Sequence, residues 1–444
     1  MIPSSIINSK EMGNTIFERK GVNGIVRMKT IDLEHVKQAF NYKPHIVNKY
    51  KLKQMFQTLI SELNKKRESI INSIIQETGK TKELAIGEFE SGLKRISFID
   101  YDIKELEPKF IDGFTFGMNR SAFVFKEPYG NALIISPFNY PFTTTLLMLI
   151  PAIVGGNNVI VKPSSLTPTP VYLLIKTMIE IGFKNIHLIL GDSHKLHDMI
   201  KFADVIGFTG STKTGYNIIK ETPNAHHVME LGGNGAALIC KDANLENTIN
   251  ALLKGCFKFS GQRCDAIRRI IIHKDIEKEF MNLFVETVKS LTLKEPLINQ
   301  NGVEKYMYAI EDARKKGANV LLEPKINGNY VSPVILTNTN KEMFIYSNEV
   351  FAPIVQIFSA KSEEEMINLA NNQPYGLDSS IFTNDINKAL QMSMLLQDGE
   401  ITINNVPSHN ISAFPFGGNK KSGKGRIGIG FSVNEFTKIK TIVF

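Results

Sequence analysis

The stretch Ala132-Leu133-Ile134-Ile135-Ser136-Pro137-Phe138-Asn139-Tyr140-Pro141 is a short apolar run that ends in a polar turn, and a helical segment follows it. The same rhythm continues along the chain. Further apolar runs, each separated from the next by a helical segment, lie at Val159–Val161, Ile186–Leu190, Val205–Phe208 and His227–Glu230. Short apolar strands that alternate with helices predict a parallel, doubly wound α/β sheet.

A second α/β unit begins at Ala236–Ile239 and continues to Ile403, so we place a domain boundary at Gly232-Gly233. Before the first unit, residues 1–31 have weak periodicity and are expected to wrap the surface. From Asp32 to Ile99 the apolar positions follow a helical period, which predicts a scaffold packed on a sheet.

Two further segments predict an arm. The stretch Phe110–Lys126 alternates loosely and carries Gly113 and Gly117, which predicts a β-hairpin. The chain ends in an apolar run, Ile439–Phe444, which predicts a terminal strand. Because such a strand needs a partner sheet, often in another subunit, we expect a homo-oligomer, either a dimer or a tetramer.

The composition excludes several classes of protein. With 444 residues, 43% of them hydrophobic and 22% charged, the chain has the make-up of a soluble globular protein. No stretch approaches the ~20 apolar residues that would span a bilayer, so no membrane partner is expected. Residues 1–5 have neither a basic start nor an apolar core, which favours a cytoplasmic location. The net charge of +8 is scattered rather than clustered, which argues against nucleic acid and fits anionic substrates.

One of the three cysteines lies in a polar setting. Cys264 ends the stretch Phe259-Ser260-Gly261-Gln262-Arg263-Cys264, whereas Cys240 and Cys256 lie in apolar patterns typical of a core. A cation next to a thiol lowers its pKa, so Arg263 would raise the thiolate fraction of Cys264 at neutral pH. Alternatively, Cys264 could be a small buried core side chain, but the polar residues Ser260-Gly261-Gln262 before it argue against this.

Two polar side chains follow predicted strands. Glu230 ends an apolar strand, where it could be a solvent-facing carboxylate or, in an active-site mouth, a general base. Asn139 precedes a helix start, where it could be a turn residue or an amide donor to an oxyanion.

A glycine turn opens the helix after Val205–Phe208. The turn has the sequence Gly210-Ser211-Thr212-Lys213-Thr214-Gly215, but Tyr216-Asn217 follow where a P-loop requires Lys-Ser/Thr. The start of a helix is nevertheless a natural binding place for a pyrophosphate. The histidines, including His226-His227 and the His194/His197 pair, have no cysteine or carboxylate at metal-binding spacing, so no metal is predicted.

Taken together, these segments resemble the aldehyde dehydrogenase superfamily from about Asp32 to the last residue. The motifs that carry the resemblance are Pro137–Pro141, Phe208–Thr212, Glu230–Gly233, Gly261–Cys264, Asn348–Pro353, Phe414–Gly418 and Lys421–Gly423. The resemblance implies an α/β fold of two doubly wound domains with a small β oligomerisation arm. The domains would be residues 1–109 and 129–231 for the dinucleotide, residues 232–422 for catalysis, and residues 110–128 and 423–444 for the arm and tail.

The resemblance also implies a reaction. An aldehyde would be oxidised to a carboxylic acid with NADP or NAD. Cys264 would be the nucleophile, Asn139 the oxyanion donor and Glu230 the base that releases the acid. The implied cofactor contacts are Lys162, Ser165, Gly210, Ser211, Glu349 and Phe351. Relatives that prefer NAD often have a glutamate at the position of Ser165, so serine there, with Lys162 nearby, predicts that NADP is accepted at least as well as NAD.

Within the superfamily, Gly-Gln-Arg-Cys is most similar to non-phosphorylating glyceraldehyde-3-phosphate dehydrogenases, in which Arg263 and Tyr140 would contact the substrate phosphate. Other parts of that pattern differ, because Ser408-His409-Asn410 stands where bacterial members have an arginine. The expected substrate is glyceraldehyde 3-phosphate, and because of these differences glyceraldehyde, lactaldehyde and succinate semialdehyde remain as alternatives. A coenzyme A-acylating enzyme generally lacks the glutamate found here at Glu230. A catalytically silent binding or structural protein would not need Cys264, Glu230, Asn139 and Glu349 together.

Overall fold

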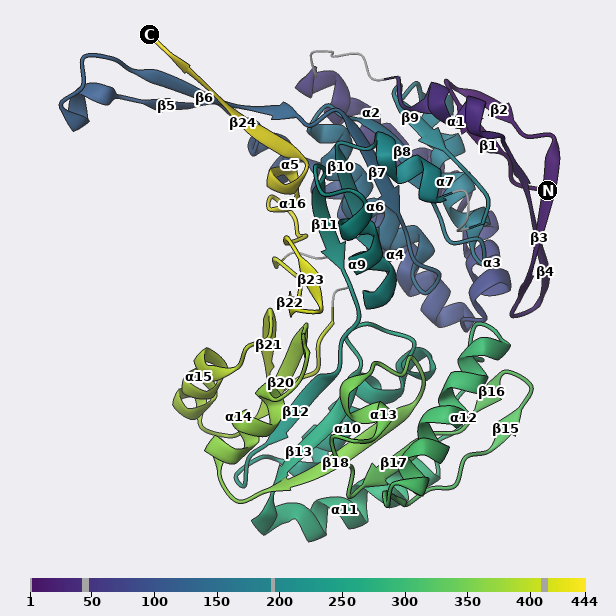
Figure 1. Ribbon diagram of the computed structural model, residues 1–444, viewed down its shortest axis with the longest axis vertical. Coiled ribbons are helices and arrows are strands. Elements are labelled where there is room, and N and C mark those ends of the chain that lie inside the picture. The colour runs from purple at the N-terminus through teal and green to yellow at the C-terminus, as the bar shows by residue number, and fades with distance from the viewer. Residues whose placement is uncertain (1, 42–47, 193–195, 409–413) are drawn as a thin grey trace.

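The computed structural model describes residues 2–41, 48–192, 196–408 and 414–444. Two α/β units lie one above the other in Figure 1, the upper formed mainly by the first half of the chain and the lower by the second. A thin three-stranded arm projects from the upper unit. The predicted fold class, two α/β units with a β arm, is confirmed.

The upper unit contains an eight-stranded sheet in the order β2-β1-β9-β8-β7-β10-β11-β23. Its central strands are parallel: β7 (Asn131–Ile135), β8 (Asn158–Lys162), β9 (Ile186–Leu188), β10 (Val205–Thr209) and β11 (His226–Glu230). The chain runs outward from β7 through β8 to β9 and then returns to place β10 on the other side of β7. Ligands bind open α/β sheets at such a reversal of strand order, beyond the carboxyl ends of the strands.

The N-terminal segment does more than wrap the surface. Strands β1 (Ser5–Ile7) and β2 (Lys10–Met12) extend the sheet beyond β9, and the side chains of Ile6 and Ile7 are buried. A hairpin of β3 (Thr15–Gly21) and β4 (Gly24–Thr30) follows. The expectation of a surface wrap was therefore wrong for β1, a strand too short to show a period in the sequence.

Helices of the upper unit cover its sheet. The predicted helical opening is confirmed, and Asp32, Asn48 and Thr81 cap three of its helices with their side chains. The helices are α1 (Leu33–Ala39), α2 (Lys49–Lys65), α3 (Arg67–Thr78), α4 (Lys82–Ser97), α5 (Ile99–Lys104), α6 (Pro141–Val154), α7 (Pro168–Ile181), α8 (Leu196–Met199), α9 (Thr212–Glu221) and α16 (Ser432–Glu435).

The lower unit contains a seven-stranded sheet in the order β14-β17-β18-β13-β12-β20-β21. Its strands are β12 (Gly235–Ile239), β13 (Ile267–His273), β14 (Asn319–Val320), β17 (Val334–Thr337), β18 (Ile354–Ala360), β20 (Asp378–Phe382) and β21 (Glu400–Ile403), all parallel except β14. Its helices are α10 (Leu245–Phe257), α11 (Lys274–Lys289), α12 (Gln300–Lys315), α13 (Phe344–Ser347), α14 (Glu363–Asn371) and α15 (Ile386–Leu395). The predicted second α/β unit is thus present.

Short two-stranded ladders complete the lower half. They are formed by β15 (Ile326–Asn327) with β16 (Tyr330–Val331), and by β19 (Tyr375–Gly376) with β22 (Asn419–Lys420). Strand β23 (Gly423–Lys424) then returns to the upper sheet beside β11. The change of sheet between β11 and β12 coincides with Gly232-Gly233. The division of the chain into functional domains stays a prediction.

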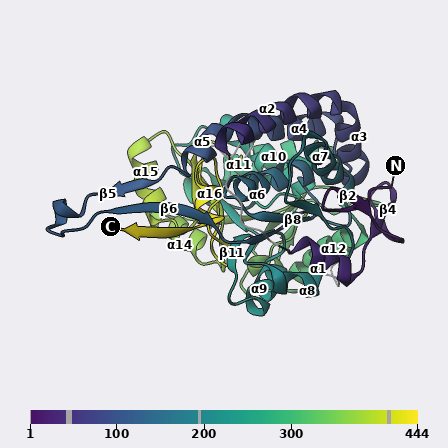
Figure 2. The same ribbon diagram turned by 90° about the horizontal axis from the view of Figure 1, so that it is seen from above.

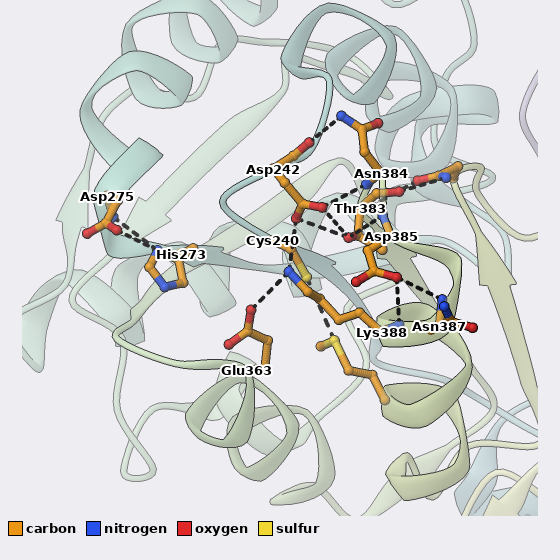
Figure 3. Close-up of polar contacts among 12 residues, drawn as sticks. Cys240, Asp242, His273, Asp275, Glu363, Thr383, Asn384, Asp385, Asn387 and Lys388 are labelled. Carbon is orange, nitrogen blue, oxygen red and sulfur yellow. Dashed lines mark hydrogen bonds and ion pairs between the residues drawn. The ribbon is translucent and has the colours of Figure 1, made fainter.

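A polar network fastens the end of β12 to the start of α15 (Figure 3). The Asp242 carboxylate accepts hydrogen bonds from the Thr383 hydroxyl at 2.8 Å and the Asn384 N–H at 3.0 Å. Lys388 joins that carboxylate to Glu363 at 3.3 and 3.4 Å. Cys240 lies beneath this network and is fully buried, and Cys256 is also buried. Both cysteines are core residues, as predicted.

The arm consists of β5 (Lys109–Ile111), β6 (Ala122–Pro128) and β24 (Thr437–Val443), with the short 3-10 helix η1 (Gly113–Phe116) near its tip. Figure 2 shows the arm extending away from the body of the molecule. The predicted hairpin and terminal strand are present. The partner of β24 is β6 of the same chain, with register from Thr437↔Pro128 to Val443↔Ala122. In the described ranges, no helix is long and apolar enough to cross a membrane.

Candidate active site

A cavity of about 960 Å³ is lined by residues of both α/β units. It lies beyond the carboxyl ends of β7, β10 and β11, at the reversal of strand order. Every side chain or turn predicted from the sequence lines it, namely Asn139, Tyr140, Lys162, Ser165, Gly210, Ser211, Glu230, Arg263, Cys264, Glu349 and Phe351. The structure therefore brings together residues up to 212 positions apart, from Asn139 to Phe351.

The backbone before Cys264 turns in a strained conformation. After α10, Phe259, Ser260 and Gly261 have φ values of 54°, 51° and 69°, in the left-handed region. A Cβ on Gly261 would lie 2.7 Å from the Ala352 carbonyl oxygen, so only glycine fits this close approach. The loop aims Cys264 at the cavity, where its side chain is partly exposed.

Two side chains that the sequence analysis did not single out hold this loop. The Gln262 amide donates to Pro296 O at 2.9 Å and accepts from the N–H of Ile298 at 2.9 Å. Arg268 donates to Gly261 O at 2.7 Å, to Arg263 O at 3.0 Å and to Ala352 O at 3.0 Å. The signal in the sequence was the arginine pair Arg268-Arg269 beside the apolar run Ile270–Ile272.

Asn139 lies against the nucleophile loop. Its side chain is 7% exposed, donates from Nδ2 to Gln262 O at 3.0 Å and accepts at Oδ1 from Tyr140 N–H at 3.1 Å. These two contacts fix which way the amide points. Since an amide nitrogen carries two hydrogens, one of them remains to donate to an oxygen bound near Cys264.

The cation beside the thiol does not act as expected. Burial, together with the negative charge of Asp265, raises the pKa of the Cys264 thiol well above its usual value. Arg263 donates from Nε and Nη2 to the two oxygens of Asp265 at 2.9 and 2.7 Å. The expectation that Arg263 raises the thiolate fraction of Cys264 at neutral pH was therefore wrong, because burial outweighs the attraction of a guanidinium that Asp265 already pairs with.

The remaining donors of Arg263 are also largely occupied. Nη2 donates to Pro407 O at 2.9 Å and Nη1 to Lys254 O at 3.3 Å, and the residue is 6% exposed. Together with the salt bridge to Asp265, these contacts are those that an arginine with only a structural role would form. The prediction that Arg263 holds a substrate phosphate stays a prediction.

Glu230 ends β11 with its carboxyl group in the cavity wall. The residue is 4% exposed, and neither carboxyl oxygen has a hydrogen-bond partner among the described residues. Burial raises the pKa of Glu230 well above its usual value, while the charge of Arg426 partly opposes that shift. A carboxyl group with a raised pKa and free oxygens suits proton transfer near neutral pH.

The predicted cofactor contacts lie along the same cavity. Lys162 ends β8 and is 6% exposed, and burial lowers its pKa to about 8. Ser211 caps α9 by accepting from Thr214 N–H, and the first turn of this helix carries N–H groups that have no acceptor within the helix. These donors suit a dinucleotide. The N–H groups of α9 can donate hydrogen bonds to its pyrophosphate, and Lys162 and Ser165 can bind its adenosine ribose.

Glu349 and Phe351 lie at the opposite end of the cavity. Glu349 accepts from Gly233 N–H at 3.2 Å, and burial raises its pKa against the opposing charge of Arg268. The ring of Phe351 meets that of Phe138 edge to face, with centroids 5.8 Å apart. A carboxylate and an aromatic ring here fit a ribose and a flat heteroaromatic ring, so the residues present fit a nicotinamide dinucleotide.

A buried ion pair supports the opposite wall, beside Tyr140. Lys80 Nζ lies 2.5 Å from Glu88 Oε2, and both side chains are fully buried. Glu88 accepts from Phe142 N–H at 2.9 Å and so caps α6 just after Asn139. Lys80 Nζ lies 3.5 Å from the centroid of the Tyr140 ring. The sequence analysis missed this pair, which lies more than 50 residues before Tyr140.

The histidines take other roles. His226 pairs with Glu435 at 3.0 Å and His227 with the Thr222 hydroxyl at 2.9 Å, while His194 lies outside the described residues. Over residues 2–41, 48–192, 196–408 and 414–444, no group of three or more His, Cys, Asp or Glu could hold a metal ion. The absence of a metal stays a prediction.

A cysteine, an amide donor and a buried carboxyl group line one cavity whose donors suit a nicotinamide dinucleotide, an arrangement that fits a dehydrogenase. Comparison with known proteins agrees with this class. Residues 34–442 match the Aldehyde dehydrogenase family, and the chain belongs to that family. The prediction of an NAD(P)-dependent aldehyde dehydrogenase is confirmed.

Three relatives show how near the chain lies to proteins of known activity. It is 33% identical to a lactaldehyde dehydrogenase of Methanococcus aeolicus over 405 residues, which cover 87% of this chain and 86% of the relative. It is 30% identical to a D-glyceraldehyde dehydrogenase (NADP(+)) of Picrophilus torridus, over 86% of this chain and 81% of that one. The crystal structure of an NADP-dependent glyceraldehyde-3-phosphate dehydrogenase from Bacillus halodurans, complexed with NADP, superposes with a TM-score of 0.95. That structure has 28% identity and covers 100% of this chain and 99% of that one.

Proposed function

We propose that this protein oxidises a small α-hydroxyaldehyde, such as glyceraldehyde or lactaldehyde, to its carboxylic acid with NADP or NAD. The observation that carries the proposal is the convergence of Cys264, Asn139 and Glu230 on one cavity with the predicted cofactor contacts. Relatives named for lactaldehyde and D-glyceraldehyde support the choice of substrate.

The chemistry follows from these three side chains. The Cys264 thiol loses its proton, and the sulfur attacks the aldehyde carbon to form a thiohemiacetal. The Asn139 amide and the Cys264 N–H stabilise the oxyanion. A nicotinamide dinucleotide held by Lys162, Ser211 and Glu349 would supply the acceptor for the hydride of that carbon, which would remain on Cys264 as a thioester. Glu230 takes a proton from a water molecule, whose oxygen attacks the thioester and releases the acid and the thiol.

The raised thiol pKa has a consequence for this sequence of steps. In the cavity as described, carboxylates surround the sulfur, so the thiol form is favoured. Glu230, whose pKa is also raised and whose oxygens are free, is the group best placed to accept the thiol proton. We therefore assign Glu230 both proton transfers: it accepts the thiol proton, releases that proton to solvent, and then accepts a proton from the attacking water.

Charge compensation in the cavity favours a neutral substrate. Arg263 is paired with Asp265, and Lys80 is paired with Glu88. Both cations next to Tyr140 are thus neutralised before any substrate arrives. A hydroxyl group on the substrate needs a hydrogen bond here, whereas a phosphate would need Arg263 to leave Asp265, which would remain buried without its partner.

Glyceraldehyde 3-phosphate is the second candidate. Lys258 lines the cavity, forms no ion pair with any residue that the structure describes, and could meet a phosphate. The crystal structure from Bacillus halodurans is of an enzyme named for this substrate. For succinate semialdehyde we find no specific contact.

The test is a panel of aldehydes with the purified protein, measured as NADPH or NADH formation at 340 nm. We expect kcat/KM for D-glyceraldehyde or L-lactaldehyde to exceed that for glyceraldehyde 3-phosphate by at least about tenfold, since a buried ion pair must break to bind the phosphate. A higher kcat/KM for the phosphate would overturn this choice and assign Arg263 or Lys258 to substrate binding. No oxidation of any aldehyde would overturn the proposed function itself.

A further inference from the structure

The β3–β4 hairpin brings an arginine to the adenosine end of the cavity. Arg19 lies on β3 and lines the cavity, as do Lys162, Ser164 and Ser165. In Figure 1 the hairpin lies at the outer edge of the upper unit, far along the chain from the other strands of the site. Nothing in the sequence between Thr15 and Thr30 indicated a part in the active site.

Strand alternation fixes the direction of Arg19. Because alternate residues of a strand share a face, Arg19 lies on the same face as Phe17 and opposite Val26 on β4. Phe17 and Val26 both pack on the hydrophobic core of the upper unit. That face of the hairpin therefore turns toward the body of the molecule, and Arg19, which is exposed, lies at the rim of the cavity.

The other face of the hairpin provides a contrast. There Arg27 pairs with Glu18 at 2.6 Å, and both side chains are about half exposed. Arg19 is also exposed, yet it forms no ion pair or hydrogen bond with any residue that the structure describes. On this hairpin, Arg27 is thus neutralised at the surface, whereas Arg19, at the rim of the cavity, is not.

Arg19 and Lys162 lie close enough to affect each other. Burial is the main cause of the lowered pKa of Lys162, and the positive charge of Arg19 lowers it further, while Asp192 opposes both. Two cations that repel each other at one end of a ligand cavity are stabilised when an anion binds between them. Ser165, which carries no charge, leaves room there for such an anion.

We propose that Arg19 binds the 2′-phosphate of NADP and, with Lys162, makes NADP the preferred cofactor of this chain. The inference rests on the proposed use of a nicotinamide dinucleotide. A guanidinium on a short hairpin can form a forked pair with phosphate oxygens at the open end of the cavity, which buried Lys162 alone cannot do. NAD has a hydroxyl group at this position and gains little from the arginine.

The experiment measures cofactor binding without turnover. NADPH and NADH are titrated separately into the full-length protein by isothermal calorimetry, for the wild type and for Arg19→Gln. We expect the substitution to raise the Kd for NADPH about tenfold and to leave the Kd for NADH nearly unchanged. Because Arg19 is exposed and unpaired, the variant should melt at the same temperature as the wild type.

Arg27→Gln is the matched control, because it removes a cation from the other face of the same hairpin. It should leave both affinities as in the wild type. The inference is overturned if Arg19→Gln binds NADPH as tightly as the wild type, if it loses NADPH and NADH equally, or if Arg27→Gln has the same selective effect. Since no aldehyde is used, an error in the proposed substrate cannot affect the result. A wild-type protein that bound neither dinucleotide would overturn the proposed function and this inference with it.

Discussion

At the residue scale, Asp378 stands out among the carboxylates behind the nucleophile loop. It begins β20, is fully buried, and neither of its oxygens has a hydrogen-bond partner among the described residues. Burial raises the pKa of Asp378 well above its usual value, and the negative charges of Asp265 and Asp398 add to this shift. A buried carboxyl without a partner favours the protonated, uncharged form.

This burial gives stability a definite dependence on pH. The pKa of Asp378 is higher in the folded than in the unfolded chain, where it is about 3.9. Its contribution to stability is therefore complete below the unfolded pKa and is lost as pH rises through the folded pKa. Asp378→Asn keeps the shape without the charge, so the variant should melt roughly 2–4 °C higher than the wild type at pH 8 and show no such gain at pH 5.

Scanning calorimetry at the two pH values measures this difference. Asp385→Asn is a suitable control, since Asp385 is an exposed carboxylate at the start of α15 and asparagine can also cap the helix. Its effect on the melting temperature should not grow between pH 5 and pH 8. If Asp378→Asn destabilises the protein at pH 8, the carboxylate has a partner in solution, and the account of an uncharged Asp378 fails.

At the scale of elements, the arm is the part whose role remains a prediction. Strand β24 pairs with β6 along its whole length, so the arm is a complete three-stranded sheet within one chain. Several apolar side chains of the arm are nevertheless exposed, among them Phe110, Phe123 and Phe444, whose rings contact one another. Exposed aromatic groups on a projecting sheet favour contact with another subunit.

Deletion of residues 439–444 tests that contact. It removes most of β24 and leaves the edge of β6 without partners, so a dimer or tetramer should shift toward monomer or insoluble material. Sedimentation velocity measures the change. Lys440→Ala is the control, because it removes an ion pair with Glu127 and keeps the backbone pairing of β24. A truncated protein that sediments as the intact one does would show that the arm does not join subunits.

At the scale of the whole molecule, the sequence predicted what hydrophobic periodicity and local motifs encode. The parallel strands from β7 to β11 appear as apolar runs because both faces of such strands are buried. Cys264, Glu230 and Asn139 were found because each lies in a short motif with an unusual polar residue. Strand β1, with three residues, is too short to show any period.

Contacts over long distances in the chain could not be predicted in this way. Nothing in the sequence around Lys80 and Glu88 indicates that the two residues pair or that Lys80 lies against the ring of Tyr140. The approach of Arg19 to Lys162 depends on the path of the N-terminal hairpin. The partner of Arg263 was only two residues away, yet the choice between Asp265 and a substrate phosphate depends on which groups share the buried space.

The central claim is that Cys264 forms a thioester that Glu230 then helps to hydrolyse. The most direct measurement is the rapid mixing of Glu230→Gln with NADP and D-glyceraldehyde, followed at 340 nm. Glutamine cannot accept a proton, so steady-state turnover should fall by roughly 10²-fold or more. Acylation should also slow, because Glu230 accepts the thiol proton, but hydrolysis, which needs a base for water, should slow more. Each active site should therefore release up to one NADPH before the steady state, and the protein should then carry the acyl group on Cys264.

Mass spectrometry of the quenched protein identifies that acyl group by its added mass. Cys264→Ala is the control, in which neither burst nor added mass should appear, although NADPH should still bind. The account predicts an acylated Cys264 that accumulates in Glu230→Gln and is hydrolysed slowly. Wild-type turnover in Glu230→Gln, or aldehyde oxidation by Cys264→Ala, would contradict it.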